Sequence, residues 1–141
     1  MELADVLDDF EFLDDWEDRY RYVLDLAKKL PPLTEAERTE ANKVRGCASQ
    51  VWVISETTAE ADPVVHIRGD SDAQIVRGLI ALLLVIYSGK RASEIVEIKA
   101  EDIFARIGLR EHLTAQRSNG LSSMIARIQR DAAQSLSTVG R

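Results

Sequence analysis

The sequence predicts an α+β domain in which helices at both ends of the chain pack on one face of a small three-stranded antiparallel sheet. Apolar side chains recur at helical spacing near both ends, and the segment between them is rich in β-branched residues that alternate with polar ones. A chain of 141 residues can bury a sufficient core without disulfides. A single domain over residues 1–141 is expected, because no repeat, low-complexity tract or linker divides the sequence.

The N-terminal region has the pattern of two amphipathic helices, or of one helix broken near Asp14 and Asp15. Pro31 and Pro32 end this region, because the residue before a proline disfavours the helical conformation. Residues 34–37 read Thr-Glu-Ala-Glu, which fits a capping box and predicts one further helical turn. The apolar positions of the two helical registers are Leu3, Val6, Leu7, Phe10 and Leu13, then Trp16, Tyr20, Val23, Leu24 and Ala27.

The middle of the chain predicts a β-hairpin formed by residues 51–54 and 64–68 with a turn at 59–63. Residues 43–45 are long enough to add a short third strand, which would place residues 46–49 at the tip between the first two strands. A helix is then expected to begin within residues 69–74, with Ser71 and Gln74 as a capping box and Asp72 in the first turn. It is apolar nearly all round as far as Tyr87, which predicts the central buried helix.

Three further helices are expected in the C-terminal part. Short helices are indicated near residues 92–96 and 101–107, the second ended by Gly108. The last helix is expected from about Asn119 onward. Its predicted buried stripe consists of Leu121, Met124, Ile125, Ile128 and Ala132.

Charge is distributed unevenly along the chain. The 18 Lys and Arg against 24 Asp and Glu give a net charge of −6, which argues against a nucleic-acid ligand, because phosphate contacts need a basic surface. Residues 1–18 carry nine acids and no base, whereas residues 106–141 carry six arginines and two acids. This asymmetry indicates either solvated helix faces or a dipolar surface that orients a docking partner. The acidic start and the short apolar runs predict a cytoplasmic protein that does not enter a membrane.

Cys47 is the only cysteine, and its role is the main chemical question that the sequence raises. One cysteine excludes an intramolecular disulfide, a redox pair and an all-cysteine zinc site, and it gives little support to a metal or Fe–S centre. Small residues flank Cys47, and Lys43 and Arg45 are close enough in sequence to favour the thiolate. The residues alone therefore leave two interpretations open, a small buried side chain or a reactive thiol at an accessible tip.

No motif completes a conventional cysteine enzyme around this thiol. Such an enzyme pairs the thiolate with a histidine base and a third orienting group. His66 is expected on the polar face of a strand and His112 in a connection between helices, and either could reach Cys47 in the folded chain. A thiol enzyme therefore stays an alternative, as does a docking module in which the thiol is incidental.

Asp72 and Arg117 stand near expected helix starts. The local interpretation is capping of a helix for Asp72 and a surface salt bridge for Arg117.

Several motifs together resemble the SufE family of cysteine desulfuration proteins. Residues 46–52, Gly-Cys-Ala-Ser-Gln-Val-Trp, resemble the family signature G-C-x-S-Q-V-W. Residues 69–80 resemble its helix-start motif and residues 113–121 its C-terminal motif. Trp16, Glu17 and Tyr20 resemble its N-terminal motif. The resemblance runs in order over nearly the whole chain.

This resemblance implies a sulfur acceptor for Fe–S cluster assembly, with the fold shared by the NifU/IscU-type scaffolds. Such proteins bind a SufS-type, pyridoxal-phosphate-dependent cysteine desulfurase, which holds sulfur from L-cysteine as a persulfide. They stimulate this partner and pass the sulfur to an Fe–S scaffold complex. The resemblance implies an accessory protein that has no turnover of its own and holds no cofactor and no metal. A homodimer is left open.

The resemblance also assigns roles to particular residues. Cys47 matches the position that accepts sulfur by attack on the outer sulfur of a persulfide, a step similar to thiol–disulfide exchange. Its loop is expected to swing outward to the desulfurase and to fold back over a reactive persulfide. Gly46, Ser49 and Gln50 belong to the loop signature, and Asp72 and Arg117 match positions expected near the loop or the partner surface.

Overall fold

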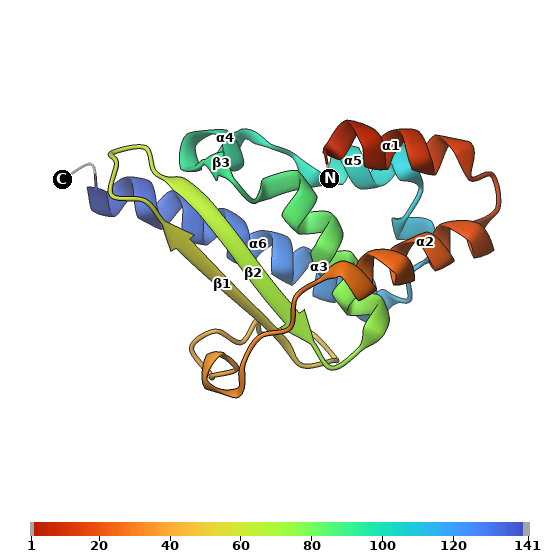
Figure 1. The fold of residues 1–141 in the computed structure, drawn as a ribbon, viewed down its shortest axis with the longest axis horizontal. Helices are drawn as coiled ribbons and strands as arrows, with labels where there is room; N and C mark the ends of the chain where they lie inside the picture. Colours follow the sequence, from red (N-terminus) through yellow and green to blue (C-terminus); the bar gives the residue numbers. More distant parts are fainter. Residues whose placement is uncertain (1, 140–141) are drawn as a thin grey trace.

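The computed structural model describes residues 2–139, with side chains described as far as residue 136. Two helices precede a β-hairpin, and the remaining helices and one short strand follow it, as an α+β fold, which confirms the predicted fold class (Figure 1). Arg141, the last of the C-terminal arginines, lies outside the described residues. The elements are α1 (Leu3–Phe12), α2 (Trp16–Lys29), the 3-10 turn η1 (Glu35–Glu37), β1 (Val51–Thr57), β2 (Val64–Ser71), α3 (Gln74–Tyr87), β3 (Lys90–Arg91), α4 (Ala92–Glu97), α5 (Ala100–Ile107), the 3-10 turn η2 (Arg110–His112) and α6 (Ala115–Val139).

The sheet has the strand order β1-β2-β3, with both pairs antiparallel. β1 and β2 form the predicted hairpin, in which Val51 faces Ser71 at one end and Thr57 faces Val65 at the other. β3 follows α3 directly, because Gly89 adopts a φ of 83° and its N–H donates to the Val65 carbonyl at 2.8 Å. The chain thereby turns back, and β3 pairs with the edge of β2 that lies opposite β1.

The third strand is not the one that the sequence predicts at residues 43–45. Lys43 forms only an isolated bridge to Trp52, and the N–H of Val44 donates to the Val51 carbonyl at 2.8 Å. Pairing stops there because Gly46, with a φ of 91°, turns the chain away from the sheet. Residues 45–50 therefore form a loop beside the start of β1 rather than a tip between two regular strands.

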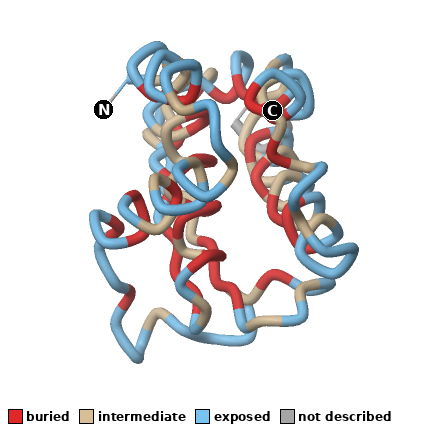
Figure 2. The backbone as a smooth tube through the Cα atoms, turned by 90° about the vertical axis from the view of Figure 1, so that its right-hand side faces the viewer, coloured by how far each residue is buried: buried red, intermediate tan, exposed pale blue. Residues whose placement is uncertain are grey.

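Helices α3 and α6 pack on one face of the sheet. Val65 and Ile67 are buried on this face, whereas His66 and Arg68 point to the exposed face, as their alternation in the sequence predicts. In Figure 1, α6 runs along the hairpin and the segment that follows α2 passes the beginning of β1. Figure 2 shows buried residues along the inner sides of the elements and exposed residues on the outer turns.

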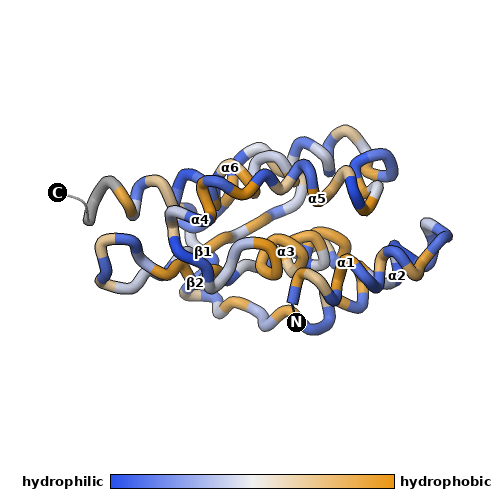
Figure 3. Tube along the Cα trace, turned by 90° about the horizontal axis from the view of Figure 1, so that it is seen from above, coloured by the Kyte–Doolittle hydropathy of each residue, from blue (hydrophilic) through white to orange (hydrophobic). Residues whose placement is uncertain are grey.

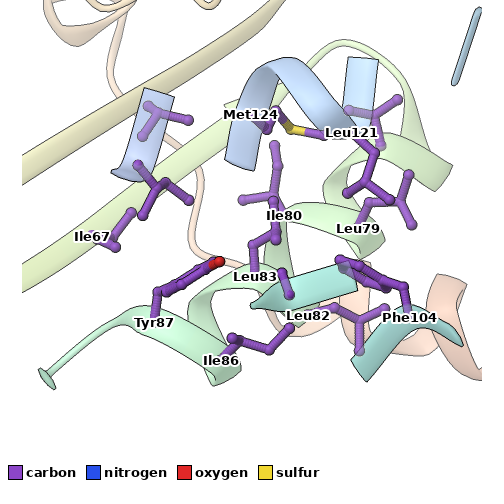
Figure 4. Close-up of a cluster of buried hydrophobic side chains, with 14 of the residues drawn as sticks. Ile67, Leu79, Ile80, Leu82, Leu83, Ile86, Tyr87, Phe104, Leu121 and Met124 are labelled. Atoms are coloured by element: carbon purple, nitrogen blue, oxygen red, sulfur yellow. The ribbon is translucent and has the colours of Figure 1, made fainter. Parts of the chain in front are cut away.

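α3 is the central buried helix that its composition predicts, and its hydrophobic colour extends along most of its length in Figure 3. The core around α3 includes Phe104 of α5 and two residues of α6, Leu121 and Met124 (Figure 4). Tyr87, the last residue of α3, belongs to the same cluster. α2 crosses α3 very closely at Gly78, where a Cβ would lie 2.3 Å from the carbonyl oxygen of Val23. Any side chain at Gly78 would therefore force the two helices apart.

The N-terminal pattern corresponds to two helices rather than one broken helix. α2 begins after Asp15, whose carboxylate accepts the N–H of Glu17 at 3.0 Å. The capping box predicted at residues 34–37 is present and opens η1, with the carboxylate of Glu37 accepting the N–H of Thr34 at 3.0 Å. The predicted short helices are also confirmed as α4 and α5, and Gly108 ends α5 in the left-handed conformation.

The predicted cap of α3 and the predicted start of α6 are wrong, because tertiary or local hydrogen bonds outcompete the sequence pattern. β2 continues as far as Ser71, so α3 begins at Gln74 and Asp72 precedes the helix instead of lying in its first turn. α6 begins at Ala115, earlier than the expected Asn119. Its start is set by Thr114, whose hydroxyl accepts the N–H of Arg117 at 3.2 Å. No helix in the described part of the chain is long and apolar enough to cross a membrane.

Candidate functional site

Cys47 lies half-buried on the loop of residues 45–50, against the first turns of α6. Its thiol donates to the carbonyl oxygen of Gly120, with a sulfur–oxygen distance of 3.6 Å. A Cβ at Gly120 would lie 3.4 Å from the Cys47 sulfur, so the missing side chain leaves the thiol room to pack on the α6 backbone. The sequence motifs do not predict this role of Gly120 in the site.

A cavity of about 380 Å³ opens beside this thiol. Its floor is apolar and comes from the start of β1, from α3 and from α6, whereas residues 114–117 supply a polar rim that includes Arg117. Arg117 and Ser49, both predicted from the family motifs, thus lie at the same cavity as Cys47. The lining residues are Cys47, Ala48, Ser49, Val51, Val76, Leu79, Thr114, Gln116, Arg117, Gly120 and Met124.

Burial raises the pKa of the Cys47 thiol above its usual value, because the charged thiolate is disfavoured away from water. The prediction that Lys43 and Arg45 favour the thiolate is therefore wrong for this position of the loop. Arg45 turns to Glu40, at 3.4 Å, and both cations line a different pocket. In this position Cys47 is a protonated thiol at neutral pH.

The far end of the loop is held by the segment that joins β2 to α3. The N–H of Gln50 donates to the carboxylate of Asp72 at 3.1 Å, and the hydroxyl of Ser71 donates to the carbonyl of Gln50 at 2.7 Å. Asp72 and Gln50, both predicted as site residues, therefore meet in one direct contact. The near end of the loop rests on α6, because a Cβ at Gly46 would lie 2.6 Å from the Ser123 hydroxyl.

A fully buried carboxylate, Asp70, fixes the end of β2 next to this anchor. It accepts the N–H of Leu33 at 2.9 Å, the guanidinium of Arg38 at 2.9 Å and the N–H of Ser71 at 2.8 Å, and it also pairs with Arg77. Burial acts to raise the pKa of Asp70, but these donors and the nearby positive charge outweigh burial, and the pKa is lowered. No role for Asp70 was predicted, because its donors are distant in sequence.

Arg127 on α6 holds the segment that leads into the Cys47 loop. Its guanidinium donates to the carbonyl of Ala41 at 3.1 Å and to that of Lys43 at 3.3 Å, and it pairs with Asp131 at 3.2 Å. Asp131 in turn accepts the hydroxyl of Ser55 at 2.8 Å. The sequence holds no local signal for this contact, because backbone carbonyls can come from any residue.

The two histidines lie away from the thiol. His66 stands opposite Glu56 on the exposed face of the hairpin. The ring of His112 stacks on that of Trp16, with 4.1 Å between the centroids. Neither imidazole lines the Cys47 cavity, so the thiol-enzyme alternative gains no base from this arrangement. Among the described residues, no three His, Cys, Asp or Glu side chains gather as metal ligands would.

The fold and the site define the class first: a small α+β protein whose only cysteine is presented on a loop above a cavity. The comparison with protein families then identifies it further. The chain belongs to the SufE family, because the model of the Fe-S metabolism associated domain SufE matches residues 4–132. The predicted family is thereby confirmed, and with it an association with Fe–S metabolism. A single domain over residues 1–141 stays a prediction.

Similar proteins agree with this assignment. A SufE-like protein of Rhizobium meliloti (strain 1021) is 60% identical over 131 residues, which cover 92% of this chain and 94% of that protein. A SufE-like protein of Rhizobium etli is 57% identical over 131 residues, covering 92% and 88% of the two chains. The solution structure of a hypothetical protein from Thermus thermophilus superposes with a TM-score of 0.76, at 24% identity and over 96% of both chains. This last likeness concerns the fold alone.

Proposed function

We propose that this protein accepts sulfur on Cys47 from the persulfide of a pyridoxal-phosphate-dependent cysteine desulfurase and passes it to an Fe–S scaffold complex. Membership of the SufE family supports the general assignment. One observation carries the specific proposal: the only thiol of the chain lies on a short loop above a cavity with an apolar floor and a cationic rim. This arrangement suits a group that must be both transferred and protected.

The transfer itself needs only one cysteine of this chain. The Cys47 thiolate attacks the outer sulfur of the partner's persulfide, and the new S–S bond forms as the old one breaks. The partner's cysteine leaves as a thiolate, and the proton of Cys47 passes to that thiolate or to water. The transferred sulfur keeps its oxidation state, so no external oxidant or reductant takes part. The partner recovers its free thiol, which accounts for stimulation of the desulfurase by an acceptor without a turnover of its own.

The cavity provides room for the product of this step. A volume of about 380 Å³ exceeds by far the roughly 30 Å³ that one water molecule occupies in the liquid, so one additional sulfur atom fits beside Cys47. The apolar floor of Val51, Val76 and Leu79 limits the approach of water and small thiols. The terminal sulfur of a persulfide carries negative charge near neutral pH, and Arg117 supplies the positive charge at the rim.

Because the pKa of Cys47 is raised in this position of the loop, movement of the loop would change the reactivity of the thiol. With the loop closed, the thiol is protonated and donates to Gly120, so it is a poor nucleophile. When the loop moves outward, Cys47 returns to solvent and its pKa falls toward that of a free cysteine. Opening therefore both presents the sulfur acceptor and activates it, and closing over the cavity shields the persulfide. A cytoplasmic setting, where thiols stay reduced, fits this chemistry.

The test is sulfur transfer followed by intact-mass measurement. The protein is mixed with a cysteine desulfurase from the same cell, L-cysteine and pyridoxal phosphate, and its mass is measured before and after treatment with reductant. We expect one added sulfur atom that reductant removes, and none on Cys47→Ser, which differs by one atom and keeps the fold. The desulfurase rate is measured in parallel.

Two results would overturn the proposal. The first is the absence of added sulfur on the wild-type protein although the desulfurase is active and binds it. The second is a Cys47→Ser variant that stimulates the desulfurase as strongly as the wild type, which would indicate a docking module whose thiol is incidental. Circular dichroism of the variant is the control that it is folded, which makes the second result decisive.

A further inference from the structure

A second pocket lies on the other side of the Cys47 loop, and its walls are strongly basic. Its volume is about 470 Å³, and it lies between residues 40–45 and α6. Four of its lining residues are cations, which we call the basic patch: Lys43, Arg45, Arg127 and Arg130. Glu40 is the one carboxylate that lines it. Such a concentration of positive charge is unusual in a chain with a net charge of −6.

Most of this charge is free to act on another molecule. Arg127 is occupied by its contacts with Asp131 and with backbone carbonyls. Lys43 and Arg130 take part in none of the ion pairs formed among residues 2–136. The pair of Arg45 with Glu40 is solvated, with side chains 80% and 76% exposed, and such pairs contribute little stability. An incoming acidic group can therefore replace Glu40 at small cost.

The basic patch directly adjoins the sulfur acceptor. Arg45 is two residues from Cys47, so their Cα atoms lie within about 7 Å of each other. Ser123, which lines this pocket, lies against Gly46. Arg130 stands two helical turns further along α6 than Ser123, about 10 Å away. A protein interface of ordinary size covers about 800 Å² on each partner, a disc of roughly 16 Å radius, so a partner centred on Cys47 also covers this patch.

We propose that the basic patch is an electrostatic docking surface for an acidic face of the protein that delivers sulfur to Cys47. The inference rests on the proposed function, and it adds the chemistry by which the partner is recognised and oriented. Arg117 lies at the cavity on one side of the loop and the basic patch on the other, so Cys47 is flanked by positive charge on both sides. A complementary acidic surface would speed association and align the partner's persulfide with the loop.

The decisive variant reverses two free charges of the patch, Lys43→Glu together with Arg130→Glu. The matched control reverses two exposed charges elsewhere, Arg21→Glu together with Arg106→Glu, which line neither the patch nor the Cys47 cavity. Both double variants change the net charge by the same amount. The concentration of acceptor that gives half-maximal stimulation of the desulfurase is measured for each at low and high salt.

We expect the patch variant to raise this concentration about tenfold at low salt and to lose most of its salt dependence, because close charge pairs control association and are screened by salt. The maximal rate at saturation stays that of the wild type, as does the reaction of Cys47 with inorganic polysulfide, which needs no docking. The control variant shifts by less than about twofold, since its charges lie outside the interface.

Failures of the two proposals are distinguishable. A wild-type protein that takes no sulfur from the desulfurase overturns the proposed function. A wild-type protein that accepts sulfur, with patch and control variants of equal half-saturation and equal salt dependence, overturns the docking surface alone. Salt-dependent retention of a polynucleotide by the patch, with unchanged stimulation of the desulfurase, would also overturn it.

Discussion

Two carboxylates at the end of β2, Asp70 within the strand and Asp72 just after it, have opposite surroundings. Asp70 is fully buried and gathers donors from two backbone amides and from Arg38 and Arg77. Asp72 is exposed, and the donor to its carboxylate is the N–H of Gln50. The first holds residues 33–38 firmly to the sheet, whereas the second holds the Cys47 loop by a bond that water can replace. Anchors of very different strength thus stand side by side, and the weak one holds the loop that the proposed function requires to move.

The difference between the two anchors is tested most directly by removing the charge of each carboxylate in turn and measuring the loss of stability. Asp70→Asn leaves the part-buried Arg77 without its carboxylate partner and removes the charge from a fully buried acceptor, and we expect it to lower the free energy of unfolding by about 3–5 kcal/mol. Asp72→Asn keeps a hydrogen-bond acceptor at an exposed site and should lower it by less than about 1 kcal/mol. Urea denaturation measures both. Equal losses would show that the two anchors do not differ in strength.

The pH dependence of stability sharpens the same contrast. The pKa of Asp70 is lower in the folded protein than the value of about 3.9 for an unfolded chain. Its contribution is therefore complete above about pH 4 and is lost as the pH falls through the folded pKa. The difference in stability between wild type and Asp70→Asn should shrink below about pH 4 and stay constant from about pH 5 to 7. A difference that grows in acid would contradict the assignment.

A smaller effect is expected at the other end of the loop, at Gly46. Gly46→Ala places a side chain on a residue with a φ of 91° and sets its Cβ against the Ser123 hydroxyl, and we expect a loss of about 2 kcal/mol. In a Ser123→Ala background the clash with the hydroxyl is removed, and about 1 kcal/mol should remain from the backbone strain. Denaturation of the four proteins of this cycle measures the coupling. Identical losses in both backgrounds would exclude the contact with Ser123.

Asp72→Ala is expected to change stability least, but to increase the rate at which Cys47 is alkylated. Asp72→Ala removes the carboxylate that accepts from Gln50, so the loop opens more often and Cys47 should react with iodoacetamide up to about fivefold faster. Asp18→Ala is the matched control, because it removes an exposed acid that pairs with the solvated Arg21. Equal alkylation rates in the two variants would show that Asp72 does not restrain the loop.

The sequence predicts most of the fold, because local patterns govern most of its elements. The helical spacing in residues 3–27, the alternation at residues 64–68 and the cap at Thr34 are each readable without tertiary information. The third strand is not, because Lys90 and Arg91 form a strand too short to carry any periodicity. The cap of α3 is misplaced for a related reason: residues 69–71 pair with β1, and this ladder overrides a capping pattern.

The site is predicted less completely than the fold. The motifs single out Cys47, Ser49 and Arg117, which the folded chain brings to one cavity. They do not indicate Gly120 or Arg127 as partners of the loop, because both act through the backbone: Gly120 offers a carbonyl and an absent side chain, and Arg127 binds carbonyls. The protonated state of Cys47 is also a tertiary property, since burial raises its pKa and the cations nearby in sequence line a different pocket.

The bridge at the base of the loop sets the length of a tether. Val44 is hydrogen-bonded to Val51 at 2.8 Å, and Arg127 binds the carbonyl of Lys43 just before it, so we expect this point to stay fixed in the loop opening that the proposed function requires. Cys47 is three residues beyond Val44, and three fully extended residues span about 10 Å. That length limits how far Cys47 can reach into a partner. If the partner's persulfide is buried more deeply than this tether and the Cys47 side chain can reach, a mobile segment of the partner must carry the persulfide outward to Cys47.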